Sequence, residues 1–258
     1  MSEINQGGLT LQIDEKGIGT ISFNHPAQNS LPSGLLAQLE QAIISATANN
    51  TVRVIVLKSE GNRTFCAGAS FEELLQIKDE HTGAAFFSGF ARVINACRKS
   101  TKLIIARVQG KAVGGGVGLA CAADYVLAAT TASVKLSELA IGIGPFVISP
   151  AVVRKIGMAA FSQLTIQATE FQTAQWAQQH GLYNELFETI EELDSATEAL
   201  AIKLAGYHSE AMANLKQIFW EGTSHWDELL TERAAISGQL VLSEFTQHAL
   251  NGFLSGKR

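Results

Sequence analysis

Residues 103–128, LIIARVQGKAVGGGVGLACAADYVLA, decide the fold of this chain. The apolar run Leu103–Val108 predicts a strand buried on both faces, and the glycine-rich turn Gly110–Gly116 comes directly after it. Small residues from Val117 to Ala123 then predict a closely packed helix, and Tyr125–Ala128 predicts the next strand. Strand, turn and helix in this order predict crossover connections and a mostly parallel sheet, so the fold class is α/β.

A second turn of this kind lies about 45 residues upstream. There the run Val52–Leu57 predicts another buried strand, and the glycine turn Phe65–Ala69 (FCAGA) follows it. Each turn presents backbone N–H groups where a helix is expected to begin, and these groups are unpaired donors at its partly positive end. Two such turns that converge would form an oxyanion hole, which stabilises negative charge on a carbonyl oxygen. Glu138 follows on an otherwise apolar stretch, so the pattern indicates proton transfer beside a polarised carbonyl.

The rest of the first half adds a hairpin and several helices. Alternating apolar and polar positions in Leu9–Ile13 and Gly17–Phe23 predict two strands joined by a tight turn. Apolar residues at helical spacing predict helices at Leu35–Ile44, Phe71–Lys78 and Gly83–Lys99.

Helical patterns dominate after Pro150, with one brief strand expected at Leu186–Phe187. From about Thr197 the pattern predicts three amphipathic helices, whose large apolar surface must pack on the main domain or on another subunit. We therefore divide the chain into a core, residues 1–196, and a C-terminal helical region, residues 197–258.

Composition and charge limit the classes of function. The 258 residues are 47% hydrophobic and 17% charged, which suffices for a large core and excludes a disordered chain. The formal net charge of −5 and the pI of about 5.7 argue against nucleic acid as a partner, whereas a local basic patch is enough to bind an anionic small ligand. The three cysteines lack metal-ligand spacing, so we expect buried packing roles and a reducing compartment.

No membrane or export segment is predicted. Residues 1–6 lack the basic stretch and apolar run of a secretion signal. The longest run of apolar residues and glycine, Val113–Ala123, is too short to span a bilayer. We expect a cytoplasmic protein that uses no metal or redox cofactor.

Two segments of the chain resemble the signatures of the crotonase (enoyl-CoA hydratase/isomerase) superfamily. Thr64–Ser70 resembles the first signature, and Val108–Gly116, followed by Ala120–Asp124, resembles the second. The similarity covers essentially the whole chain in the right order. It implies a ββα spiral core with a C-terminal helical region, assembled as a homotrimer or a dimer of trimers. It also implies an acyl-CoA thioester as ligand, so that CoA enters as part of the substrate and no separate cofactor is needed.

The resemblance also implies roles for particular residues. The oxyanion donors would be the backbone N–H groups of Ala69 and Gly115, and Glu138 would be the acid/base. Glycine allows the backbone to approach the thioester closely. Residues expected to contact the substrate lie in the two turns and after Glu138; they are Cys66, Ala67, Gly68, Gly114, Gly116, Gly118, Pro145 and Phe146.

The acidic residues favour one reaction of the family over another. Many hydratases of the family carry two glutamates, and here the first position is Gly118 while the second is Glu138. Ser70 stands where the family usually has aspartate, and the stretch from Glu138 to Phe146 is similar to that of single-glutamate isomerases. One carboxylate can take a proton from C2 of a 3-enoyl thioester and return it at C4. The sequence therefore favours double-bond isomerisation.

Three alternatives stay open at this point. The chain could be an enoyl-CoA hydratase, including a methylglutaconyl-CoA type, in fatty-acid or branched-chain amino-acid breakdown. The missing acid at Gly118 and the apolar C-terminal helices are also consistent with a non-catalytic acyl-CoA-binding member. Finally, Glu138 could be a surface acid paired with Lys135 or Arg154.

Asp124, which directly precedes the strand predicted at Tyr125–Ala128, is expected to anchor hydrogen bonds rather than to take part in the chemistry.

Overall fold

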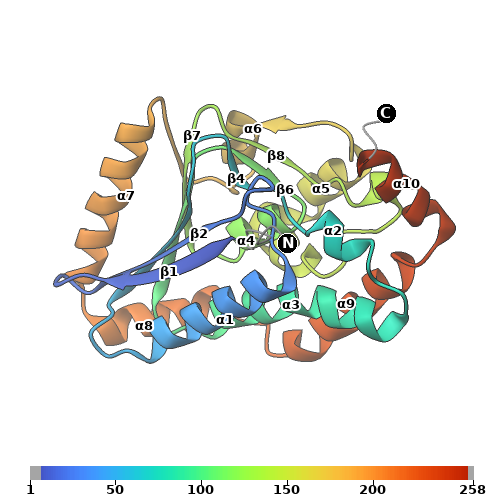
Figure 1. The fold of residues 1–258 in the computed structure, drawn as a ribbon. Helices are drawn as coiled ribbons and strands as arrows, with labels where there is room; N and C mark the ends of the chain where they lie inside the picture. The colour runs from blue at the N-terminus through green and yellow to red at the C-terminus, as the bar shows by residue number, and fades with distance from the viewer. Residues whose placement is uncertain (1–6, 255–258) are drawn as a thin grey trace, which may run out of the picture.

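A six-stranded sheet forms the centre of the computed structural model, which describes residues 7–254 (Figure 1). Its strand order is β1-β2-β3-β5-β7-β10, and only the β1–β2 hairpin is antiparallel. Residues 1–6, from which we expect no secretion signal, lie outside the described residues. The strands of this sheet are β1 (Gly8–Ile13), β2 (Ile18–Asn24), β3 (Val54–Ser59), β5 (Leu103–Val108), β7 (Tyr125–Ala129) and β10 (Glu185–Phe187).

A smaller sheet brings together segments that follow the strands of the large one. Its order is β4-β6-β8-β9, with β9 antiparallel and the other pairs parallel. In the chain, β3 leads to β4, β5 to β6 and β7 to β8, so one strand–strand–helix unit is repeated three times. The strands are β4 (Thr64–Cys66), β6 (Lys111–Val113), β8 (Ser133–Lys135) and β9 (Gln172–Thr173).

Helices cover both faces of the large sheet. Figure 1 shows α1, α3 and α9 along one side and α7 on the other. The sheet residues alternate accordingly: Ile55 and Leu57 join the larger core beneath α1 and α3, while Val54 and Val56 pack under α7. The helices are α1 (Ser33–Ala48), α2 (Phe71–Leu74), α3 (Glu80–Lys99), α4 (Gly115–Cys121), the 3-10 turn η1 (Leu139–Ile141), α5 (Ser149–Ile166), α6 (Ala174–Gln179), α7 (Ile190–Ala205), α8 (Ser209–Phe219), α9 (Trp226–Leu240) and α10 (Glu244–Leu254).

The α/β class, the hairpin and the buried strands are confirmed, while two helical predictions were wrong in extent. The helix predicted to run to Lys78 ends at Leu74. Residues 197–254 hold α8, α9, α10 and the second half of α7, which is four helices in place of the three predicted. Helix α7 begins earlier because Thr189 and Glu192 form a capping box, in which each side chain accepts a hydrogen bond from the other residue's amide.

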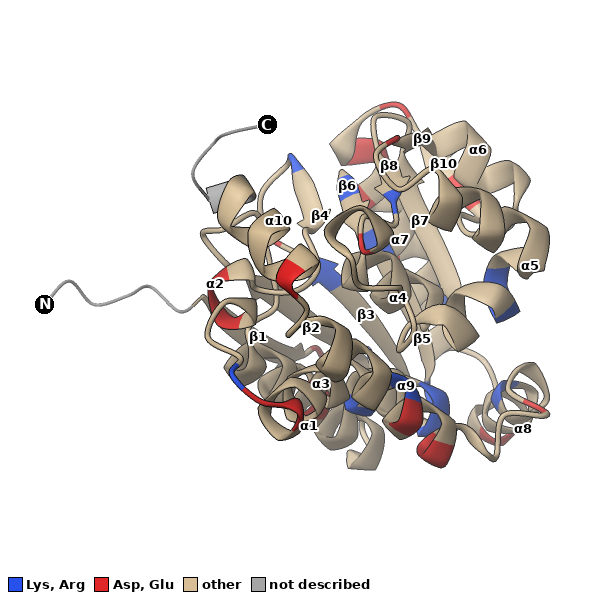
Figure 2. Ribbon diagram, turned by 90° about the vertical axis from the view of Figure 1, so that its right-hand side faces the viewer, with Lys and Arg blue, Asp and Glu red and all other residues tan. Residues whose placement is uncertain are grey.

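Acidic and basic positions are interspersed over the helices and loops of the described chain (Figure 2). Among residues 7–254, no helix combines the length and the apolar character needed to cross a membrane.

Candidate active site

The two glycine turns meet at one edge of the small sheet. β4 and β6 pair in parallel, so the chain leaves both strands on the same side. A Cβ atom on Gly68 would lie 2.8 Å from the carbonyl oxygen of Val113 and 3.2 Å from the amide nitrogen of Gly115. Gly116 packs in the same way against the backbone of Cys66. Because neither contact leaves room for a side chain, these glycines allow the turns to touch.

The amides of Ala69 and Gly115 stay unpaired at this junction. Within the described chain, neither N–H donates a hydrogen bond to another residue. Gly115 is the first residue of α4, where an amide has no partner inside the helix. Ala69 follows Gly68, whose carbonyl accepts a hydrogen bond from the Leu31 amide at 2.8 Å. Both unpaired donors therefore lie on a fixed backbone.

Two buried polar side chains hold the first turn in place. Asn29 Nδ2 donates to the carbonyl of Thr64 at 2.8 Å, and Gln109 Nε2 donates to the same oxygen at 3.2 Å. Gln109 also donates to the Ser59 hydroxyl at 2.9 Å, which ties the turn to β3. Sequence reasoning missed both roles, because each bond joins residues 35 or more positions apart.

Glu138 is brought to the second turn by β8. The amide of Gly114 donates to the carbonyl of Lys135 at 2.8 Å, which ties the turn to the end of that strand. The carbonyl of Glu138 accepts from the amides of Ile141 and Ile143, so its backbone is fixed. Gly114 has a φ of 54°, and a Cβ atom there would lie 2.8 Å from Glu138 Oε1. Glycine at 114 thus leaves the space that the carboxylate needs.

The Glu138 carboxylate is buried although the residue as a whole is half-buried. Its Oε2 atom is enclosed and accepts no hydrogen bond from the described residues. Burial raises the pKa of Glu138 to about 7. The pairing considered with Lys135 or Arg154 is not found, since the Lys135 ammonium lies over the ring of Phe171 and Arg154 stacks on Trp220.

A cavity of about 50 Å³ joins the two turns and Glu138. The three residues predicted to be catalytic, Ala69, Gly115 and Glu138, line it. Four of the residues predicted to contact substrate line it as well: Ala67, Gly68, Gly114 and Pro145. The remaining wall is mostly apolar and comes from α2, α3, the η1 region and α9. The lining residues are Ala67, Gly68, Ala69, Phe71, Leu74, Phe87, Phe90, Gly114, Gly115, Ser137, Glu138, Ile141, Ile143, Gly144, Pro145, Val147, Ile148 and Ser237.

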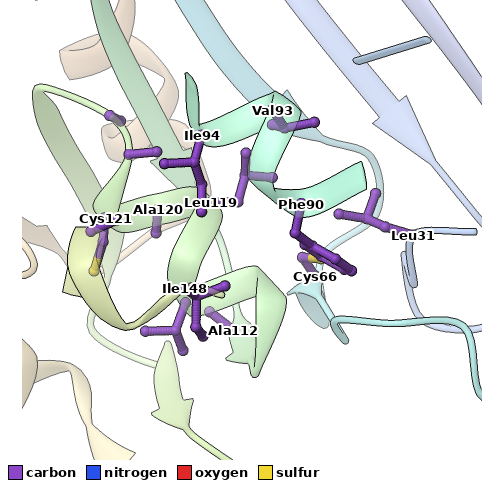
Figure 3. Close-up of a cluster of buried hydrophobic side chains, with 14 of the residues drawn as sticks. Leu31, Cys66, Phe90, Val93, Ile94, Ala112, Leu119, Ala120, Cys121 and Ile148 are labelled. Atoms are coloured by element: carbon purple, nitrogen blue, oxygen red, sulfur yellow. The ribbon is translucent and has the colours of Figure 1, made fainter. Parts of the chain in front are cut away.

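Four residues predicted to contact substrate, Cys66, Gly116, Gly118 and Phe146, lie outside the cavity wall. The Cys66 thiol is fully buried beside Phe90 (Figure 3), and burial raises its pKa to about 12, so it stays neutral. At Gly118 a Cβ atom would lie 2.5 Å from Ile148 Cγ2. Figure 3 shows Ile148 against the small helix α4. The position of the family's first glutamate is therefore occupied by an apolar side chain, and no second carboxylate lines the cavity in residues 7–254.

The wall from the C-terminal helices includes a residue that sequence reasoning missed. Ser237 of α9 lines the cavity about 100 residues after Glu138, where no motif indicates a site. Phe87 and Phe90 of α3, which sequence left as either core or pocket wall, are both buried and in the wall.

Known proteins share this arrangement of sequence and fold. The sequence model described as Enoyl-CoA hydratase/isomerase matches residues 14–253. The chain is 32% identical to the mitochondrial methylglutaconyl-CoA hydratase of Rattus norvegicus over 188 residues, which is 72% of this chain and 59% of that protein. It is 26% identical to a Bacillus subtilis (strain 168) protein named "Probable enoyl-CoA hydratase", over 97% of this chain and 96% of that one.

The fold is shared with solved structures as well. The crystal structure of enoyl-CoA hydratase from Bacillus halodurans matches with a TM-score of 0.87 over 95% of this chain and 99% of that chain, at 20% identity. The repeated strand–strand–helix unit, the two touching glycine turns and the family match agree with one another. The chain belongs to the enoyl-CoA hydratase/isomerase family of the crotonase superfamily.

Proposed function

We propose that this enzyme acts on an acyl-CoA thioester through an enolate, with Glu138 as the acid/base. The observation that carries this proposal is the cavity itself, where two unpaired amides and a buried, unpaired carboxylate oxygen share one wall. The amides of Ala69 and Gly115 donate hydrogen bonds to the thioester oxygen. Loss of one such donor typically costs about 3–4 kcal/mol of transition-state stabilisation.

The reaction that fits a single carboxylate best is movement of a double bond from position 3 to position 2. Ionised Glu138 takes a proton from C2, and the electron pair moves onto the thioester oxygen to give the enolate. The same carboxyl group then returns the proton at C4, and the double bond forms between C2 and C3. Ile148 fills the space at Gly118, which leaves Glu138 as the one carboxylate on the described cavity wall.

Hydration of a 2-enoyl thioester is the second candidate. The names of the relatives from Rattus norvegicus and Bacillus subtilis favour it. Hydration adds a hydroxyl group to C3 and a proton to C2, so it requires water to be held near C3 as well as a proton from Glu138.

The absorbance of the conjugated thioester separates the two reactions. Purified protein is mixed with a 3-enoyl-CoA and, separately, with a 2-enoyl-CoA. A rise with the first ester and no change with the second is expected for the isomerase. A fall with the second supports the hydratase, and no change with either ester contradicts both.

A further inference from the structure

Two residues of the loop between β2 and α1 hold a backbone conformation that residues with a side chain rarely adopt. Among the non-glycine residues of the described chain, only Gln28 and Asn29 have a positive φ, 56° and 55°. Left-handed backbone is unfavourable for a residue with a Cβ atom, and it persists where the surrounding structure enforces it, often at functional sites. Two such residues in succession indicate that the path of this loop does more than connect β2 to α1.

The Asn29 side chain supplies bonds that enforce this conformation. Asn29 is 7% exposed, and its Oδ1 accepts from the His25 amide at 3.0 Å. The His25 carbonyl accepts in return from the Asn29 amide at 2.9 Å, so the loop closes on itself. The Nδ2 of Asn29 donates to the carbonyls of Glu60 and Thr64 at 2.9 and 2.8 Å. One side chain therefore joins the strained loop to the segment that leads into the first glycine turn.

The backbone on either side of Asn29 pairs with that turn. The carbonyl of Gln28 accepts from the Ala67 amide at 3.2 Å, and the Leu31 amide donates to the Gly68 carbonyl at 2.8 Å. Leu31 and Ala69 also form an isolated parallel β-bridge. Residues 28–31 thus contact three successive residues of the first glycine turn.

The bond from Leu31 determines the direction of the Ala69 amide. The Gly68 carbonyl and the Ala69 N–H belong to one planar peptide group, and no peptide bond of the described chain is cis. The C=O and N–H of a trans peptide point in opposite directions. Since the carbonyl points toward Leu31, the Ala69 N–H points away from it. Leu31 is buried and does not line the cavity, whereas Ala69 does.

The same bond also makes the Ala69 N–H a better donor. A hydrogen bond accepted by the carbonyl polarises the peptide group, and the N–H of that group then donates more strongly. The Leu31 amide can do this only while residues 28 and 29 keep the loop against the turn.

We propose that Asn29 is a positioning residue for the reaction. It holds the loop so that the Leu31 amide fixes the Gly68–Ala69 peptide group, and with it the oxyanion donor of Ala69. This inference rests on the proposed function, because it takes the Ala69 amide to bind the thioester oxygen. It assigns a role in the reaction to a side chain that lies outside the cavity wall.

Difference infrared spectroscopy of bound butyryl-CoA, isotope-labelled at the thioester carbonyl, tests this role on the full chain. Donors aimed at the carbonyl oxygen weaken the C=O bond, so the bound ester absorbs at a lower frequency than the free ester. The frequency, the dissociation constant and the rate of C2 proton exchange are measured for the unmodified protein and for two asparagine variants.

The variants are Asn29→Gly and Asn184→Gly. Glycine adopts a left-handed backbone without strain, so Asn29→Gly removes the side-chain bonds while the loop conformation remains accessible. Asn184 is the matched control, because its Oδ1 also accepts from a distant backbone amide, that of Val126 at 2.8 Å, and it does not line the cavity.

Asn29→Gly is expected to lose part of the frequency shift and to exchange the C2 protons about 10- to 100-fold more slowly, with a much smaller change in Kd. Asn184→Gly should keep both signals. An unchanged frequency in Asn29→Gly, or the same loss in both variants, overturns the positioning role while the oxyanion hole stands. No frequency shift of the ester bound to the unmodified protein overturns the proposed function and this inference together.

Thr64→Val is the second variant, for the case in which Asn29→Gly does not fold. Thr64 Oγ1 donates to Gln28 Oε1 at 2.9 Å, and valine keeps the shape of threonine without the hydroxyl group. The variant should move the carbonyl frequency in the same direction by a smaller amount. An unchanged frequency in folded Thr64→Val would overturn the role assigned to the loop.

Discussion

The Glu138 carboxylate combines burial, a missing partner and a raised pKa at one position. Its Oε2 atom is enclosed and accepts no hydrogen bond from residues 7–254, and burial raises the pKa of Glu138 to about 7. A base with a pKa near the working pH is both ionised often enough to accept a proton and acidic enough to return it. The same burial that makes this residue costly to ionise therefore suits it to two successive proton transfers.

The pH dependence of the rate follows from this pKa. Proton abstraction needs ionised Glu138, so kcat/KM should fall about tenfold per unit as the pH drops below about 7. Steady-state kinetics with a 3-enoyl-CoA between pH 5 and pH 9 measures the profile. A rate that stays constant down to pH 5 would contradict Glu138 as the base.

Glu138→Gln separates catalysis from stability. The amide keeps the shape but cannot transfer the proton, so kcat should fall about 10²- to 10⁴-fold while ester binding remains. Because the pKa of Glu138 is higher in the folded than in the unfolded state, its contribution to stability is present at low pH and is lost as the pH rises through about 7. The variant should therefore gain in Tm relative to the unmodified protein from pH 5 to pH 8. Wild-type turnover in the variant would exclude the assignment.

At the scale of elements, the second glycine turn leaves room for the Glu138 carboxylate because glycine occupies position 114. Gly114→Ala places a methyl group 2.8 Å from Glu138 Oε1 and should displace the carboxylate. A displacement of about 1 Å at a reacting group can lower the rate about 10²-fold. Gly61→Ala is the matched control, because Gly61 also has a positive φ, 77°, but has no atom within 4 Å of the added carbon.

Both alanine variants should lose stability from backbone strain, on the order of 1–3 kcal/mol each, because both glycines have a positive φ. Only Gly114→Ala should also lose kcat. Thermal unfolding and kinetics on the two proteins check this, and equal activities in both would show that Gly114 does not make room for the carboxylate.

The elements with local signals could be predicted from sequence. Leu103–Val108 is a strand in the structure because a run that is apolar at every position but Arg107 fits a sheet covered on both faces, and the glycine turns carry their own pattern. The capping box at Thr189 was also local, and it places the start of α7 at Ile190, before the boundary of about Thr197 that we drew from the sequence. Ser237 could not be found this way, since its place in the cavity depends on the crossing of Gly83 and Gly238, 155 positions apart.

At the scale of the whole molecule, a buried ion pair joins the C-terminal helices to the large sheet. Lys216 of α8 and Asp124 lie 2.5 Å apart, and their side chains are 2% and 5% exposed. Asp124 also accepts from the Ile104 amide at 2.8 Å and from Trp220 Nε1 at 3.1 Å. The expectation that Asp124 anchors hydrogen bonds is confirmed. One carboxylate thus fixes β5 and two residues of the C-terminal region.

Asp124→Asn should destabilise the fold strongly, because it leaves the Lys216 charge buried without a counter-charge. Breaking a buried pair in this way costs about 3–5 kcal/mol. Lys16→Ala is the control: its pair with Glu198 is exposed at 54% and 67%, and such pairs contribute about 0–1 kcal/mol. Urea unfolding measures both, and a similar loss in the two variants would contradict the anchoring role of Asp124.

Exchange of the C2 protons of butyryl-CoA in deuterated water tests the central claim most directly. This ester has no double bond, so incorporation of deuterium reports enolate formation alone, whichever reaction the enzyme completes. We predict exchange with the unmodified protein and none above background with Glu138→Gln, followed by mass spectrometry of the recovered ester. No exchange with the unmodified protein, or equal exchange with the variant, would contradict an enolate formed by Glu138.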